Sequence, residues 1–171
     1  MPVPAAATTA VAGQPARASA QFNALAAQMA FALNPPSVRA HQTAAQSVAS
    51  NTATAVTLDA ETVDTDGIHS LTTNTSRLTI VSGGTYRVTG TCGLNAGTGV
   101  VTVRLTKNGV VTTAVRTMLG ASSAVYTPIT DEIPCVATDY VEMTVTHTNS
   151  TAVNTTASSD TVFLQARWVS I

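Results

Sequence analysis

The residues best suited to chemistry are four acidic side chains that lie close together in the sequence, Asp59, Glu61, Asp64 and Asp66. Asp64-Thr65-Asp66-Gly67 has the alternating carboxylates and the glycine that open a calcium-binding loop. Such a loop should close with a bidentate glutamate near Thr75, and the sequence has none there. We therefore interpret the segment as a turn held by hydrogen bonds from aspartate side chains to the backbone.

Catalytic chemistry finds little support elsewhere in the chain. Glycoside cleavage needs an acid pair that flanks a bound sugar, and one Trp, three Tyr and three Phe leave few rings to line a sugar cleft. His41 and His147 do not stand at metal-ligand spacing from His69, so we interpret all three as surface or packing histidines. There is no Gly-x-Ser-x-Gly elbow, Cys/His signature or phosphate-binding glycine loop. We predict that the protein is not an enzyme and uses no metal or cofactor.

Two cysteines, Cys92 and Cys135, are too few for a disulfide scaffold. Both lie in segments with the alternating pattern of strands, and a free cysteine behaves as a small hydrophobic residue. We predict two buried free thiols. A bridge is the alternative if the two strands are neighbours.

Charge is scarce. Charged residues make up 10% of the chain, with a net charge of −1, against about 25% in typical soluble domains. Because Lys and Arg are scattered singly, we expect no nucleic-acid binding. No run of about 18 uncharged apolar residues is present, so we expect no membrane insertion, and the N-terminus lacks the features of a secretory signal. A surface this poor in charge favours packing against copies of the same chain.

The elements that position these residues change character at Asn34-Pro35-Pro36. Residues 1–15 lack periodicity and predict an extended arm. Residues 16–33 contain no Gly, Pro or β-branched residue and predict a helix, which the prolines end. Its apolar stripe consists of Phe22, Leu25, Met29 and Leu33, three or four positions apart. A helix this short is marginal alone, so the stripe should pack on a neighbouring domain or, as a bundle, on its own copies.

The rest of the chain has the signals of strands. Apolar and polar residues alternate, or Thr and Val dominate, in segments 77–81, 86–94, 101–106, 110–118, 141–146 and 161–171. Asn108-Gly109 between two of these segments predicts a hairpin. Eight to ten strands without a second helix predict an all-β antiparallel jelly-roll sandwich over residues 37–171, preceded by the arm and helix of residues 1–36. Residues 149–160 predict an exposed polar loop, and with residues 95–99 they are the candidates for ligand recognition by loops.

Two blocks resemble the tumour necrosis factor-like jelly roll, which includes the globular head of complement-type collagenous proteins. They are Gly84-Thr85-Tyr86-Arg87-Val88-Thr89-Gly90 and Val101-Thr102-Val103-Arg104-Leu105-Thr106-Lys107-Asn108-Gly109. The family's Gly-Asp before a late strand appears as Thr138-Asp139, so the glycine is replaced and the turn should differ. Phe163-Leu164-Gln165-Ala166 resembles the last central strand. The resemblance covers residues 38–171 and implies this fold for them.

A second resemblance begins at the N-terminus. Ala12-Gly13-Gln14-Pro15, Phe22-Asn23-Ala24-Leu25 and Leu33-Asn34-Pro35-Pro36 resemble the N-terminal region of small tail-region proteins of tailed bacteriophages. Gln42-Thr43-Ala44-Ala45-Gln46-Ser47 and Asp64-Thr65-Asp66-Gly67-Ile68-His69-Ser70 are similar to the segments that follow in these proteins. This resemblance implies a trimeric structural protein of the virion, assembled in the host cytoplasm, with no catalytic residues to carry over.

We therefore expect a division of labour along the chain. Residues 1–36 should attach to other virion proteins through Phe22, Leu25, Met29 and Leu33, and residues 37–171 should be displayed as a homotrimer. The leading interpretation is a minor tail or fibre-like protein, with a host cell-surface glycan as a further candidate partner. The alternatives are a capsid decoration protein that cements the phage head, and a soluble carbohydrate- or receptor-binding module.

Overall fold

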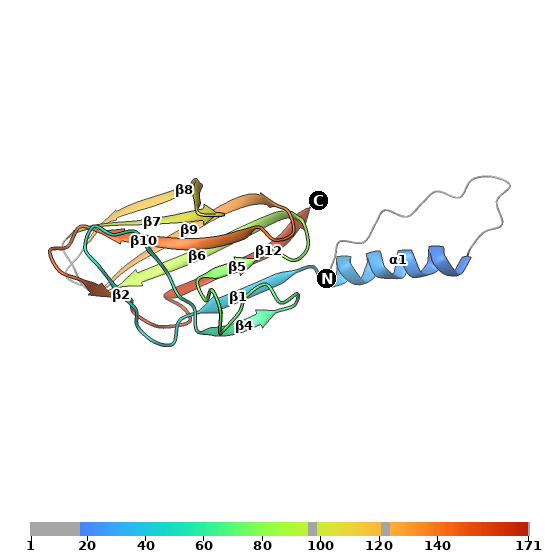
Figure 1. Ribbon diagram of the computed structural model, residues 1–171, viewed down its shortest axis with the longest axis horizontal. Helices are drawn as coiled ribbons and strands as arrows, with labels where there is room; N and C mark the ends of the chain where they lie inside the picture. Colours follow the sequence, from blue (N-terminus) through green and yellow to red (C-terminus); the bar gives the residue numbers. More distant parts are fainter. Residues whose placement is uncertain (1–17, 96–98, 121–123, 171) are drawn as a thin grey trace.

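The computed structural model describes residues 18–95, 99–120 and 124–170, in which one helix precedes a β domain. Helix α1 (Ala18–Leu33) projects from one end of that elongated domain (Figure 1). The strands are β1 (Ser37–His41), β2 (Ser47–Val48), β3 (Thr54–Ala55), β4 (Ala60–Asp64), β5 (Arg77–Thr79), β6 (Gly84–Leu94), β7 (Val100–Lys107), β8 (Val110–Leu119), β9 (Val125–Cys135), β10 (Tyr140–His147), β11 (Val153–Asn154) and β12 (Val162–Ser170). The predicted arm, residues 1–15, lies outside the described residues.

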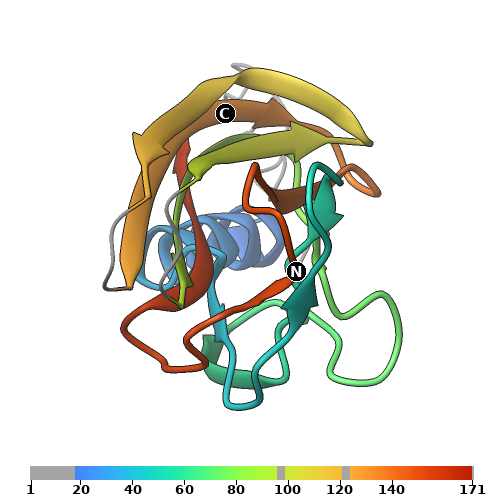
Figure 2. The same cartoon turned by 90° about the vertical axis from the view of Figure 1, so that its left-hand side faces the viewer.

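Two antiparallel sheets make up the sandwich (Figure 2). One sheet has the order β4-β1-β12-β6-β9, and the other has the order β3-β10-β7-β8, with β5 also pairing with β10. The short strands β2 and β11 form a ladder of their own. All the strand pairs are antiparallel. The predicted jelly-roll sandwich is confirmed.

The core lies between the sheets and follows the alternation seen in the sequence. Every second residue of β12, Val162, Leu164 and Ala166, is at most 1% exposed, because successive side chains of a strand point to opposite faces. Gly90 in β6 belongs to the same core. A Cβ atom there would stand 2.9 Å from the sulfur of Met143 in the opposite sheet, so the glycine leaves the space that this fully buried methionine occupies.

The hairpin between β7 and β8 turns at the predicted dipeptide. Asn108 has φ 51° and Gly109 has φ 78°. Positive φ at both central residues is the signature of the two-residue turn that matches the twist of antiparallel strands. Lys107 pairs with Val110 across the turn. The hairpin prediction is confirmed.

Two parts of the β domain differ from the prediction. Strand β9 was not predicted, since its Pro128 and Pro134 weaken the pattern of a strand. Residues 149–160 were predicted to be an exposed loop, and this is wrong in the middle of the segment. Val153–Asn154 form β11, which pairs with β2, and the adjacent Thr155 is fully buried and bonds to the backbone of Gln46. The segment is polar in composition, but its side chains and backbone form hydrogen bonds within the protein, so its burial could not be predicted from composition.

Candidate functional site

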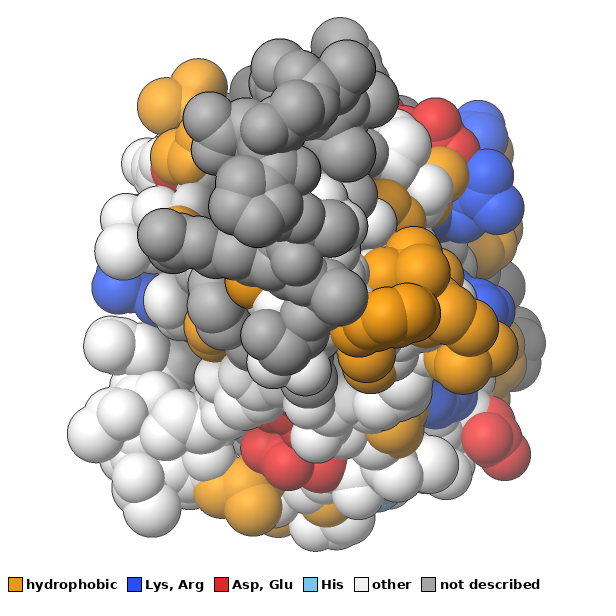
Figure 3. Space-filling view, turned by 90° about the vertical axis from the view of Figure 1, so that its right-hand side faces the viewer, with side chains coloured by type: hydrophobic (Ala, Val, Ile, Leu, Met, Phe, Trp, Pro, Cys, Tyr) orange, Lys and Arg blue, Asp and Glu red, His pale blue; other side chains and the backbone are white. Residues whose placement is uncertain are grey.

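The apolar stripe of α1 is exposed along its whole length. Phe22 is 70% exposed, Leu25 49%, Met29 56% and Leu33 82%. The view of this end of the molecule shows hydrophobic side chains gathered in a patch, with charged side chains elsewhere on the same face (Figure 3). The stripe is therefore not packed on the chain's own β domain within the described residues, and its packing on a domain of another molecule or in a bundle stays a prediction. An exposed apolar surface of this kind marks an interaction site.

The opposite side of the helix holds it to the domain. Phe31 is 5% exposed and packs edge-on against Trp168 of β12. At about 100° of rotation per residue, Phe31 lies on the other side of the helix from Phe22. Because Phe31 makes the contact, the stripe faces away from the domain. Sequence reasoning missed this role, for which the signal was a single aromatic residue off the stripe.

The linker that follows the helix is fixed by hydrogen bonds to the sheet. The amide of Trp168 donates to the carbonyl oxygen of Pro36 over 2.9 Å. The amide of Ser37 donates to Oγ1 of Thr65 over 2.9 Å, and the amide of Thr65 donates to the carbonyl oxygen of Ser37 over 3.0 Å. The direction in which the helix leaves the domain is thereby set by the β sheet.

Strand β8 is a second exposed apolar surface. Its side chains include Val110 at 71% exposure, Val111 at 48%, Val115 at 45%, Met118 at 41% and Leu119 at 81%. Neighbouring residues of a strand point to opposite faces, so the two ends of β8 are exposed on both faces. On its far side from β7, β8 pairs with no other strand among the described residues. The run of Val and Thr without strict alternation was the signal of this exposure in the sequence.

Strand β9, at one edge of the other sheet, differs from β8 in its residue types. Pro128 and Pro134 stand six positions apart, so their nitrogen atoms point the same way along β9. Proline in a sheet is tolerated where its nitrogen faces away from the partner strand, which here is β6. These prolines remove donors from the free edge of β9, a common protection against unwanted pairing. Strand β8 has no proline and a single charge, Arg116, and therefore lacks this protection.

A shallow groove of about 750 Å³ lies beside the junction with the helix, lined by residues 81–85, 107, 134–137 and 139. Its charged pair is Lys107 and Asp139, whose Nζ and Oδ2 atoms are 2.8 Å apart. Hydrogen bonds from Lys107 and then Asn108 lower the pKa of Asp139 from 3.8 to about 2. Burial raises the pKa of the Cys135 thiol, also in this groove, to about 11. The groove thus contains a satisfied ion pair and an unreactive thiol.

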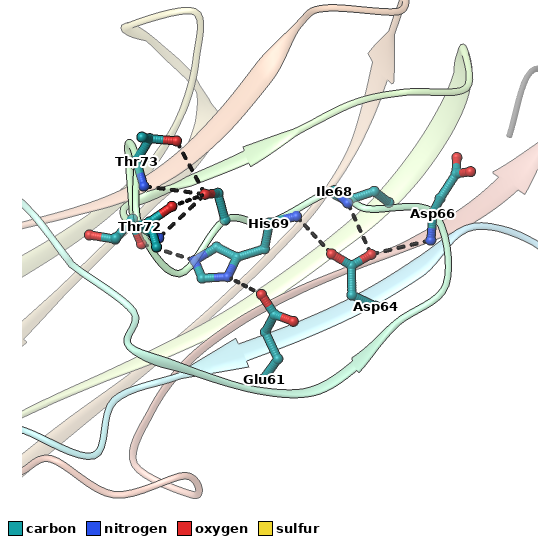
Figure 4. Close-up of polar contacts among 9 residues, drawn as sticks. Glu61, Asp64, Asp66, Ile68, His69, Thr72 and Thr73 are labelled. Carbon is teal, nitrogen blue, oxygen red and sulfur yellow. Dashed lines mark hydrogen bonds and ion pairs between the residues drawn. The ribbon is translucent and has the colours of Figure 1, made fainter.

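The acidic loop predicted as a turn is held by Asp64 (Figure 4). One oxygen of its carboxylate accepts the amides of Asp66 and Ile68, over 3.2 and 2.9 Å. The other oxygen accepts the amide of His69 over 2.9 Å. This confirms the interpretation as an Asx-type turn. Among the described residues, no group of three or more His, Cys, Asp or Glu side chains is placed to hold a metal ion.

Two of the three histidines are packing residues. His69 has a fully buried side chain, with Nδ1 2.8 Å from a carboxylate oxygen of Glu61 and Nε2 3.1 Å from the carbonyl oxygen of Thr75. His147 is fully buried, and its Nε2 lies 2.9 Å from the carbonyl oxygen of Val48. His41 is half-buried on the β1 strand. These contacts agree with the interpretation from spacing.

The two cysteines are buried and free. Their strands, β6 and β9, are neighbours, which was the condition for a bridge. The register nevertheless pairs Cys92 with Thr127 and Cys135 with Gly84, so the cysteines are offset by eight positions, about 26 Å along the strands. Burial also raises the pKa of Cys92 to about 12. The prediction of free thiols is confirmed.

The segments proposed for ligand recognition meet at the end of the domain that lies away from α1 (Figure 1). The amide of Asn95 donates to the carbonyl oxygen of Asn154 over 2.9 Å, and the amide of Gly99 donates to Oδ1 of Asn149 over 2.6 Å. Residues 96–98 of the first segment lie outside the described residues. The structure thus brings together two segments that are about 50 residues apart in the sequence.

Comparison with known proteins identifies the fold. No protein-family model matches the chain, and no curated protein matches it in sequence. The chain is similar in structure to the globular domain of zebrafish complement 1qA, with a TM-score of 0.56 and 11% identity over 78% of this chain and 97% of that one. Murine APRIL at pH 8.0 gives 0.60 and 11% over 78% and 98%. Eiger TNF from S. frugiperda gives 0.53 and 10% over 79% and 94%. These likenesses show a jelly roll of the tumour necrosis factor and complement 1q type.

Proposed function

We propose that this chain is a trimeric structural protein of a tailed-phage virion, attached through residues 1–36 and displaying its jelly roll, as a minor tail or fibre-like protein. The observation that carries the proposal is the polarity of the molecule. An uncharged helix with an exposed apolar stripe leaves one end of the β domain, and two connecting segments meet at the other (Figure 1). A protein held at one end and presented at the other requires this layout.

The trimer is supported by β8. A long apolar edge strand exposed on both faces is a liability in a protein that stays alone. Covering it with another copy of the chain removes the liability and buries Val111, Val115 and Met118, and only Arg116 in the strand carries a charge that must be desolvated. The prolines of β9 disfavour the addition of a strand from another copy at that edge. We therefore expect the copies to contact one another through side chains rather than through a continued sheet.

The proposal assigns no catalytic step. The acidic loop is occupied in holding its own backbone, and the groove near the helix contains a satisfied ion pair. The prediction that the protein is not an enzyme rests on this use of its acidic side chains and stays a prediction. A host-surface glycan would be recognised at the far end, where segments 95–99 and 149–160 meet.

The experiment that tests the proposal is incorporation into particles. Tagged full-length chain and tagged residues 37–171 would be produced separately in cells infected by the phage that encodes the chain, and the particles purified by gradient centrifugation. We expect only the full-length chain to sediment with particles, and immunogold labelling to place it on the tail. Labelling over the head would instead identify a decoration protein. Sedimentation of neither form with particles would contradict the proposal.

A further inference from the structure

The chain's own β domain does not cover the apolar stripe of α1, so we expect a partner to cover it. The contact of Phe31 with Trp168 uses the opposite side of the helix, and the linker is bonded to β12 and to Thr65. Rotating the helix to bury the stripe would break these contacts. The stripe is therefore available to a partner while the helix remains attached to the sheet.

The chemistry of the stripe restricts that partner. No residue of α1 carries a charge: its sequence is ASAQFNALAAQMAFAL. A charged partner surface would gain no ion pair here and would lose hydration on burial. An uncharged apolar helix face fits this surface, and the same helix of another copy has that face.

The spacing fits a helical seam. Phe22, Leu25, Met29 and Leu33 follow one another at steps of three, four and four, which keeps one narrow line along a helix. The small Ala26 and Ala32 lie beside this line and are exposed, so the backbones of neighbouring helices can approach closely. At sixteen residues, about 24 Å, the helix is marginal in water by itself, and a seam would supply the burial that it lacks.

We propose that the stripe of α1 is the core of a parallel bundle formed with the same helix of other copies of this chain. The inference rests on the trimer of the proposed function and names the partner of its attachment helix. The helix extends beyond one end of the β domain (Figure 1), so copies with their domains side by side and aligned present their helices in the same direction. The predicted arm, residues 1–15, then remains the segment that contacts other virion proteins.

The test is disulfide cross-linking in the purified full-length chain. Met29→Cys places a thiol on the stripe, and Ala27→Cys, also at an exposed position, places one on the far side of the helix as the matched control. The native Cys92 and Cys135 are buried. With copper–phenanthroline as the oxidant, we expect Met29→Cys to give a covalent dimer several-fold faster than Ala27→Cys, since equivalent seam positions come within disulfide reach. Equal rates would overturn the inference.

A second arm separates this inference from the proposed function. Met29→Glu introduces a charge into the seam and Ala27→Glu introduces the same charge outside it. We expect only Met29→Glu to abolish cross-linking of a Leu25→Cys reporter. Particles that contain Met29→Cys would also be oxidised. A cross-link from this chain to a different virion protein would overturn the bundle proposal but support the proposal that the chain is part of the virion. Self-cross-linking of a chain that is absent from particles would support the bundle while the virion proposal fails.

Discussion

The ring of Phe31 in α1 packs edge-on against the indole of Trp168 in β12, with ring centroids 4.9 Å apart and an angle of 88° between the planes. This contact joins the last turn of the helix to the strand that closes the domain. The indole nitrogen also donates to the carbonyl oxygen of Gly83 over 3.3 Å. The pair connects the attachment helix to the displayed domain, beside the hydrogen bonds that fix the linker.

Replacing Phe31 should release the helix without unfolding the domain. Trp168 is the only tryptophan of the chain, so the fluorescence reports the surroundings of this one indole, of which the Phe31 ring is a part. In Phe31→Ala we expect emission at longer wavelength, because the indole gains water, and a loss of at least about 1 kcal/mol in the free energy of unfolding, because an aromatic pair contributes about that much beyond the burial of its area. Asn34→Ala, at an exposed position that directly follows the same turn and lies outside the stripe, is the control. An unshifted spectrum in Phe31→Ala would show that the rings do not touch in solution.

A charge on β8 should dissociate the trimer. Val115 is 45% exposed on β8, and Val63 is 40% exposed on β4, an edge strand of the other sheet. We expect Val115→Lys to shift the mass in light scattering from trimer towards monomer, because a lysine would be buried without a partner. Val63→Lys should leave the mass unchanged. Dissociation by both variants, or by neither, would rule out β8 as the specific interface.

The Lys107–Asp139 pair should contribute stability that depends on pH. The pKa of Asp139 is about 2 in the folded protein, against 3.8 for an aspartate without these partners. The stabilisation is therefore complete above about pH 4 to 5 and is lost as pH falls through 2. We expect Asp139→Asn to cost about 1 kcal/mol at pH 7 after allowance for solvent screening. Urea unfolding of both proteins from pH 7 to 2 measures this. A difference that stays constant across the range would contradict the assignment.

Thr138 occupies the turn where the related fold has a glycine. Its φ is 78°, a region that a β-branched residue adopts only under strain. We expect Thr138→Gly to raise the free energy of unfolding by about 1 kcal/mol, since relief of strain outweighs the added freedom of the unfolded chain. Ala137→Gly, one residue earlier and without a positive φ, should lower it. Destabilisation by both variants would show that Thr138 is unstrained.

The sequence predicts the parts of this structure that depend on local pattern. The end of α1 at Leu33, the alternation in β12 and the Asn108-Gly109 hairpin all follow from residue type and spacing. In each case the residues that decide the conformation are neighbours in the sequence.

The features that escaped prediction depend on contacts between distant residues. Strand β9 pairs with β6 across about 40 residues, and its prolines are tolerated because it lies at an edge. The stripe of α1 was visible, but Phe31, the residue that points it away from the domain, acquires its role only when Trp168 lies beside it. No local pattern of α1 specifies which of its two apolar sides meets the β domain.

The central claim, that the chain is a trimeric protein of the phage tail, is tested most directly by its copy number in purified particles. Mass spectrometry measures that number when isotope-labelled peptides of this chain and of the major capsid protein are added as standards. Cleavage after Lys and Arg releases the peptides 40–77 and 88–104 from the β domain, and both suit the measurement. We predict a small number of copies per particle, in a multiple of three, as expected for a trimer on the tail. Hundreds of copies would contradict the tail location and assign the protein to the head. Absence of the chain from particles that carry all their other proteins would contradict the virion proposal.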